Sequence, residues 1–332
     1  MTTSGPDHVS GLDVAVFRAE AVAPETARFN QQLRERLKDL PGPEAGGGGL
    51  PLPPAEPSQR ARTIRIAGRD GHELALRVIA PDHPEGVYLH FHGGGFVGGS
   101  AAQSDQVLER ITRNTGLACI DVDYRLAPTH PHPAAWDDAE SAAIWLIENA
   151  RSEFGTDALA IGGESAGATL AASVLVRLRE RRGSTGFQAA NLVFGTFDLS
   201  MTPSQLLLGA DAVPVSTDII RACTEAVAPR NEQRQDSGLS PLYADLRHLP
   251  EALFTVGTLD PFLDDSLFMH VRWVAAGNPA ELAVYPGGTH AFTSFPIPLA
   301  DQANDRIDAF LRRVGRGRPA GQDRASSSVA TS

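Results

Sequence analysis

The chain has 332 residues, of which 42% are hydrophobic, and its formal net charge at pH 7 is −11. This length suits one α/β domain with an added segment, and the apolar fraction is enough for a large core. The acidic balance and the lack of a basic cluster argue against nucleic acid and anionic membranes as partners.

The amino-terminal residues show no targeting signal, and the cysteines show no cross-linking pattern. The first residues have neither a basic nor an apolar signal region, and no apolar run reaches the length of a membrane span. Cys119 and Cys223 give no disulfide framework and fit a reducing compartment. These features predict a soluble, cytoplasmic protein without a membrane partner.

Residues 1–57 are predicted to form an N-terminal cap segment followed by a connector. Phe29, Leu33 and Leu37 recur at helical spacing, so a helix is expected over residues 25–40. Residues 41–57 are rich in proline and glycine and are expected to be a mobile connector.

The core is predicted to span residues 58–196 and 236–314. An antiparallel pair of strands comes first, and from residue 87 onward strands alternate with helices, which is typical of a mostly parallel sheet covered on both faces. The expected strands are 63–67, 73–80, 87–91, 118–123, 157–162, 191–194, 253–257 and 281–285, and the expected helices are 103–115, 135–150, 166–182, 265–277 and 298–313.

Two further segments fall outside this alternation. Residues 197–235 join no obvious strand and are predicted to be an inserted cap segment that covers the catalytic edge of the sheet together with the N-terminal segment. Residues 315–332 are polar, lack aromatic side chains and are expected to be disordered.

The pattern G-x-S-x-G occurs once at a predicted strand-to-helix junction, as Gly163-Glu164-Ser165-Ala166-Gly167. In that context it predicts a nucleophile elbow, a strained turn that exposes the hydroxyl of Ser165. A glycine-rich turn with an incidental serine is the alternative interpretation of the pentapeptide alone.

A glycine run follows the strand 87–91 and supports the elbow interpretation. It begins His92-Gly93-Gly94-Gly95, and backbone N–H groups of such a run can approach a developing oxyanion without side-chain obstruction. The expected donors are the amides of Gly94, Gly95 and Ala166. A phosphate cradle is the rival interpretation, but no G-K-[ST] follows the glycines.

The remaining triad members are expected later in the chain, in the order acid and then histidine. Asp260 follows the strand 253–257, and His290 follows the strand 281–285 after two glycines. Both therefore lie at the carboxyl edge that carries Ser165. Asp264 and Asp265 compete for the role of the acid, but their simpler interpretation is capping of the helix that starts near Ser266.

Taken together, these motifs resemble the hormone-sensitive-lipase-like branch of the α/β-hydrolases, the bacterial family IV esterases. The resemblance covers about residues 60–315 and also includes Asp123 to Pro128 and Ser240-Pro241-Leu242. It implies an α/β-hydrolase fold with a helical cap, and it implies Ser165, Asp260 and His290 as the triad.

The resemblance also bears on neighbouring positions. It implies that His92 braces the glycine loop, with Gly93 as a further support. The chain has Glu164 where many members have aspartate, and Ala291 where many have glycine. His90 is expected to be a packed or half-exposed strand residue, and Arg125 an anchor for its own loop.

The sequence thus predicts a serine carboxylesterase for short-chain acyl esters, with a small-molecule ester as substrate and no cofactor. The histidine pairs 90/92 and 130/132 lack accompanying acidic or cysteine ligands, so no metal is expected. Candidates for the pocket wall are Phe96, Glu164, Leu206, Leu207, Val213 and Phe292. The five apolar residues among them are at least as readily interpreted as core residues.

Other activities on the same fold stay open. An amide, carbamate or lactone hydrolase would use the same triad. A non-catalytic ligand receptor is a second alternative, against which the presence of His290 argues. The oligomeric state is left open, with a homodimer as one alternative.

Overall fold

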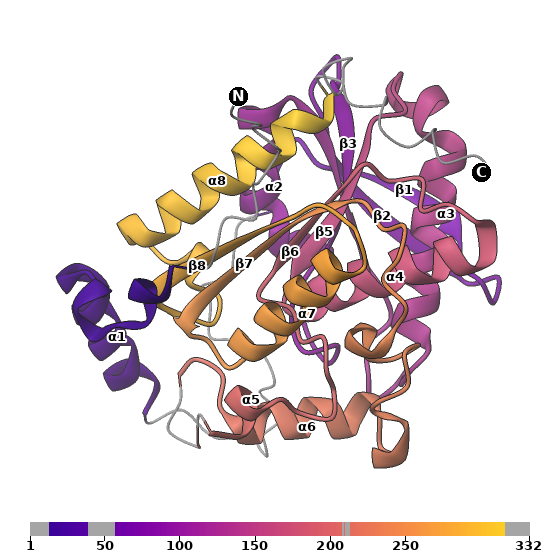
Figure 1. Cartoon of the computed structure of the whole chain (residues 1–332). Coiled ribbons are helices and arrows are strands. Elements are labelled where there is room, and N and C mark those ends of the chain that lie inside the picture. Colours follow the sequence, from indigo (N-terminus) through magenta and orange to yellow (C-terminus); the bar gives the residue numbers. More distant parts are fainter. Residues whose placement is uncertain (1–12, 39–56, 208, 210–212, 316–332) are drawn as a thin grey trace, which may run out of the picture.

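The computed structural model describes residues 13–38, 57–207, 209 and 213–315. Within these residues the chain forms an eight-stranded sheet in the order β1-β2-β4-β3-β5-β6-β7-β8 (Figure 1). The strands are β1 (Arg62–Ala67), β2 (Glu73–Ile79), β3 (Gly86–Phe91), β4 (Leu117–Val122), β5 (Leu159–Glu164), β6 (Ala189–Val193), β7 (Glu251–Leu259) and β8 (Ala280–Thr289). Strand β2 pairs antiparallel with β1 and β4, and the other neighbours are parallel. The predicted mostly parallel sheet is confirmed.

Helices cover both faces of this sheet (Figure 1). They are α1 (Pro24–Leu37), α2 (Asp105–Thr115), α3 (Ala134–Phe154), α4 (Ala166–Arg182), α5 (Pro203–Leu207), α6 (Thr217–Val227), α7 (Leu263–Ala275) and α8 (Pro298–Gly315). Helices α3, α4 and α7 contribute to one hydrophobic cluster, and α2 and α8 contribute to the other. This is the doubly covered arrangement that the alternation of strands and helices predicted.

The central strand β3 shows how the sequence fills both clusters. All six of its residues are buried, as expected of a parallel strand covered on two sides. Because successive side chains point to opposite faces, Val87, Leu89 and Phe91 join the cluster under α3, α4 and α7, while Tyr88 joins the one under α2 and α8.

Strands β5 and β8, which lead to the candidate site, extend beyond their predicted bounds. Strand β5 runs to Glu164, so it ends at the residue before Ser165. Strand β8 runs to Thr289 through Gly287 and Gly288, which read as a turn in the sequence. Its pairing with β7 continues to Leu259 opposite Thr289 across a register shift, and this pairing keeps the glycines in the sheet.

The segments outside the alternation lie at the periphery of the sheet. Helix α1 contacts β8, and the Nδ2 of Asn30 donates a 2.8 Å hydrogen bond to the carbonyl of Gly287. Helix α5 packs against α6 and α7, and Figure 1 shows α5 and α6 together below the sheet. Most of the predicted connector 41–57 and of the predicted disordered tail 315–332 lie outside the described residues, as do positions 1–12, 208 and 210–212. No helix in the described part of the chain is both long and apolar enough to cross a bilayer.

Candidate active site

Ser165 occupies a strained turn between β5 and α4. Its φ is 55° and its ψ is −120°, a sparsely populated combination that costs of order 1–3 kcal/mol and persists only where the surroundings impose it. Those surroundings are backbone atoms, because a Cβ on Gly167 would lie 1.8 Å from the carbonyl oxygen of Phe91 and one on Gly163 would lie 2.3 Å from it. The two glycines of the pentapeptide are therefore required by close approach to β3.

Three side chains from separate strand ends meet at this turn. The Oγ of Ser165 lies 3.1 Å from the Nε2 of His290, and the Nδ1 of His290 lies 3.0 Å from an oxygen of Asp260. His290 and Asp260 are buried, whereas Ser165 is partly exposed. The structure thus brings together the serine, histidine and acid that the sequence proposed.

The parallel strands β7 and β8 position the histidine and the acid. Asp260 directly follows β7 and His290 directly follows β8, so both lie at one edge of the sheet. The rings of Phe194 and Phe262 meet the His290 ring edge-on, with centroids 4.8 and 5.0 Å away. Ala291 has a φ of 62°, a left-handed conformation that glycine would adopt without strain.

The glycine run after β3 passes directly over the turn. A Cβ on Gly93 would lie 3.5 Å from the Cβ of Ser165. The carbonyl of Gly94 accepts from the N–H groups of Val97 and Gly98 and so folds the run into a tight loop. The N–H group of Ala166 lies at the start of α4, where helical N–H groups have no partner within the helix.

His92 and Tyr124 support this loop from below. The His92 ring stacks on Tyr124 with centroids 4.2 Å apart, and its Nδ1 lies 2.8 Å from the carbonyl oxygen of Gly93. The Tyr124 hydroxyl donates to the carbonyl of His92 at 2.8 Å. These contacts fix the start of the glycine run. Arg125, the next residue, binds Asp138 and Asp70 and anchors its own loop, as predicted.

His90 is fully buried and makes charged contacts that the sequence did not predict. Its Nε2 lies 2.6 Å from a carboxylate oxygen of Glu164, and its Nδ1 lies 3.1 Å from one of Asp121. Burial alone would lower the pKa of His90, but the two carboxylates raise it to about 10. Glu164, whose side chain is 24% exposed, therefore binds a buried cation with its carboxylate.

The predicted capping role of Asp264 and Asp265 is wrong, because α7 begins at Leu263 and both residues lie in its first turn. The Asp265 carboxylate accepts hydrogen bonds from the backbone of Asp198 and from the side chains of Thr202 and Gln205, at 2.9, 2.7 and 2.7 Å. Burial raises the pKa of Asp265 to about 7. The pair binds the inserted segment, with Asp264 accepting from the backbone N–H of Ser204.

The residues proposed for the pocket wall occupy different environments. Phe96 is buried against Trp136, with centroids 4.8 Å apart, and Phe292 is buried among core residues, so the alternative core interpretation describes both positions. Leu206 and Leu207 are 49% and 84% exposed on α5. Val213 and Glu164 are both partly buried.

The helix α6 of the inserted segment contacts the glycine loop through Cys223. A Cβ on Gly95 would lie 2.7 Å from the Sγ of Cys223. Burial raises the pKa of this thiol to about 11. The contact places part of the inserted segment directly against the loop next to Ser165.

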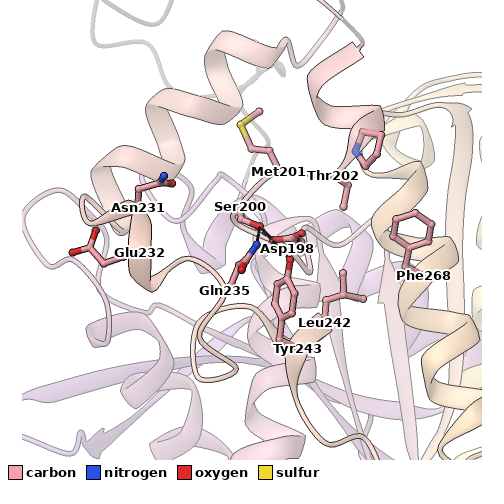
Figure 2. Close-up of a pocket in the computed structure, with 11 residues that line it drawn as sticks. Asp198, Ser200, Met201, Thr202, Asn231, Glu232, Gln235, Leu242, Tyr243 and Phe268 are labelled. Atoms are coloured by element: carbon pink, nitrogen blue, oxygen red, sulfur yellow. Dashed lines mark hydrogen bonds between the residues drawn. The ribbon is translucent and has the colours of Figure 1, made fainter.

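A separate cavity of about 620 Å³ lies at the base of the inserted segment (Figure 2). Figure 2 shows Tyr243 and Asp198 pointing toward one another, at a hydrogen-bond distance of 2.9 Å. Among the described residues, the lining does not include Ser165, Asp260 or His290. The cavity therefore lies apart from the three side chains that meet at the turn. No group of three or more potential metal ligands occurs in the part of the chain that the structure describes.

Known proteins resemble this chain in sequence and in structure. Residues 88–294 match the family described as having the alpha/beta hydrolase fold. The esterase LipI of Mycobacterium tuberculosis is 32% identical over 298 residues, which is 86% of this chain and 89% of that protein. An acetyl esterase of Salmonella typhi is 28% identical over 78% of this chain and 82% of its own length.

Solved structures share the same architecture. The hyperthermophilic esterase of the archaeon Pyrobaculum calidifontis superimposes with a TM-score of 0.77 at 28% identity, over 88% of this chain and 98% of that one. An arylesterase superimposes with a TM-score of 0.74 at 25% identity, over 88% of this chain and 98% of its own.

Proposed function

Because the chain belongs to the α/β-hydrolase family, in its hormone-sensitive-lipase-like branch, and is a carboxylic ester hydrolase, we propose that it cleaves short-chain acyl esters through a covalent acyl-enzyme. Ser165 is the nucleophile, His290 is the general base, and Asp260 is the triad carboxylate that orients His290. The observation that carries this assignment is the continuous set of contacts at 3.1 and 3.0 Å on a strained, partly exposed turn.

Acylation begins when Ser165 Oγ attacks the ester carbonyl carbon while His290 Nε2 takes the hydroxyl proton. Asp260 holds the Nδ1–H of His290 and stabilises the imidazolium that forms. The carbonyl π electrons move to oxygen, which becomes the oxyanion of a tetrahedral intermediate. The intermediate collapses when the C–O bond to the alcohol breaks and His290 gives its proton to the departing oxygen.

The oxyanion is received by the N–H groups of Gly94, Gly95 and Ala166. Three observations support this assignment: the glycine run folds over Ser165, His92 braces the run, and Ala166 lies at the start of α4. Water then attacks the acyl-enzyme, His290 takes its proton, and the carboxylic acid leaves as the proton returns to Ser165. These steps use only the side chains, the backbone N–H groups and water, so the reaction needs no cofactor.

The preference for short acyl chains rests on the family and on the inserted segment. A relative is named an acetyl esterase. The inserted segment is held by hydrogen bonds from buried and half-buried polar groups at its base, which suits a fixed cap over a finite pocket better than a broad apolar lid. Each added methylene contributes about 0.8 kcal/mol only while it finds apolar surface to bury.

A rate series on soluble esters of increasing acyl length tests this specificity. We expect kcat/KM to peak at roughly two to six acyl carbons and to gain nothing from further methylenes. A triolein emulsion serves as the matched comparison and should be a poor substrate. A maximum at about twelve carbons or beyond, or a rise in rate at the emulsion surface, would identify a true lipase instead. A cytoplasmic location and a homodimer stay predictions.

A further inference from the structure

Three charged side chains meet on neighbouring strands beside the nucleophile turn, the strained turn at Ser165 formed by residues 163–167. Asp121 on β4, His90 on β3 and the terminal residue of β5, Glu164, make the contacts of 3.1 and 2.6 Å described above. A neutral imidazole has only one N–H group, so it would turn a lone pair toward one of the two carboxylates. Nε2 makes a hydrogen bond to Glu164, whereas Nδ1 meets the Asp121 oxygen as an ion-pair contact outside hydrogen-bond geometry. The two negative charges beside the ring favour its imidazolium form.

The sheet register brings these residues together. His90 pairs with Asp121 on one side and with Gly162 on the other. Gly162 has no side chain, and Glu164 lies two residues later on the same face of β5. A Cβ on Gly162 would lie 2.6 Å from the Tyr88 hydroxyl, so that hydroxyl occupies the space beside Gly162, and the His90 ring contacts the Glu164 carboxylate beyond it.

Other ionisable groups near the ring are the hydroxyls of buried tyrosines. The Tyr88 ring on β3 lies with its centroid 5.7 Å from that of His90, and the Tyr88 hydroxyl accepts from Asn191 on β6. Burial raises the pKa of Tyr88 and of Tyr124 well above the usual value, so both hydroxyls stay neutral. Asp121 and Glu164 are therefore the groups that set the charge of His90.

We infer that Glu164 is a positioning residue for Ser165, fixed by the buried His90 ring that Asp121 supports from the next strand. This inference rests on the proposed role of Ser165 as nucleophile. The strained serine is held on its C-terminal side by α4, whose Thr169 N–H donates to the Ser165 carbonyl at 3.2 Å. On its N-terminal side, the Ser165 N–H donates to the Val193 carbonyl at 2.9 Å, and the side chain of the preceding residue, Glu164, is held by His90. A charge-assisted hydrogen bond of this kind is among the stronger ones in proteins.

The competing explanation is an ion pair that stabilises the fold and nothing more. A matched control is the pair between half-buried Arg110 on α2 and buried Asp308 on α8, which joins two helices and lies away from the strand ends. Asp308→Asn should lower stability without changing the reactivity of Ser165. Glu164→Gln keeps the size of the side chain and removes its charge, and Glu164→Ala removes the contact.

The experiment measures the second-order rate of Ser165 labelling by a fluorophosphonate, with peptide mapping of the adduct and with stability recorded for each variant. We expect labelling to slow about tenfold in Glu164→Gln and up to about 100-fold in Glu164→Ala, because small misplacement of a reacting group has effects of this size. Asp308→Asn should label within about twofold of the unaltered enzyme.

A pH series adds a signature that a purely structural pair would not give. Losing the Glu164 charge removes a cause that raises the pKa of His90, so this ring should deprotonate at lower pH in Glu164→Gln. The labelling rate of that variant should then fall at a lower pH than that of the unaltered enzyme.

The inference is overturned if Glu164→Gln labels as fast as the unaltered enzyme with the same pH profile, or if Asp308→Asn slows labelling equally. Should Glu164→Ala fail to fold, Glu164→Gln decides alone. Absence of an adduct on Ser165 in the unaltered enzyme would instead contradict the proposed function, so the two failures are distinguishable.

Discussion

The nucleophile turn and the inserted segment 197–235 are held by different kinds of contact. At the turn, Gly163 and Gly167 lie so close to the backbone of β3 that no added carbon fits. The inserted segment is bound at its base by the carboxylates of Asp264 and Asp265, which accept hydrogen bonds from four of its residues. We therefore expect the turn to be sensitive to added side-chain volume. The inserted segment should be sensitive to changes in charge, to loss of hydrogen bonds and to pH.

The largest difference between the two regions is expected when the aspartates that follow β7 are substituted. Asp260→Asn should lower kcat by about four orders of magnitude, because an asparagine favours the wrong histidine tautomer. Asp264→Asn is the matched control, since its amide oxygen can still accept from Ser204, and it should act mainly on stability. Steady-state rates on a small chromogenic ester measure both, and reversed effects would reassign the acid.

A smaller but still severe effect is expected from filling the close approach at the turn. Gly167→Ala forces a Cβ to within 1.8 Å of a backbone oxygen, so we expect a loss of about 3 kcal/mol or more in the free energy of unfolding. The control is Gly155→Ala at the end of α3, where the φ is 75° and nothing lies near the new carbon. That change should cost only about 1–2 kcal/mol of backbone strain. Equal losses in urea unfolding would argue against the close-approach explanation.

The inserted segment should respond more mildly to loss of a hydrogen-bond acceptor. In Asp265→Asn the amide NH2 must face one of three donors, which leaves a buried donor unpaired and costs about 1–3 kcal/mol. Because Thr202 and Gln205 lie in the inserted segment, the variant should change KM and acyl-length preference more than kcat on acetate esters. A variant with unaltered acyl preference would show that Asp265 supports only the fold.

The pH dependence of stability should also reveal Asp265. Its pKa is about 7 in the folded protein and near 3.8 otherwise, so the folded state keeps a proton that the unfolded state has lost between these values. Its contribution therefore makes stability fall as pH rises from about 4 to 7, with no further change above. Asp265→Asn should remove this part of the slope in unfolding experiments, whereas Asp264→Asn should retain it.

The site residues that directly follow a predicted strand were predictable from the sequence. Ser165, His290 and Asp260 each follow a buried apolar run, and a parallel sheet brings the carboxyl ends of such runs together. The extension of β8 through Gly287 and Gly288 was not predictable in this way, because glycine pairs usually mark turns and only pairing with β7 keeps them in the sheet.

Contacts between distant side chains were also missed. Asp265 binds Asp198, which is 67 residues away, and its neighbours in sequence suggested a helix cap. His90 and Glu164 are 74 residues apart, and their contact depends on β3 lying beside β5. The alternation of His90 with His92 and the position of Glu164 at a strand end were the available signals, but strand order was needed to join them.

The most direct test of the catalytic assignment is covalent labelling at the turn. A fluorophosphonate probe should add one adduct per chain, and peptide mapping should place it on Ser165. Ser165→Ala should fold normally, take no adduct and lose esterase activity by about six orders of magnitude. Unchanged labelling of Ser165→Ala, or an adduct mapped to another residue, would contradict the account.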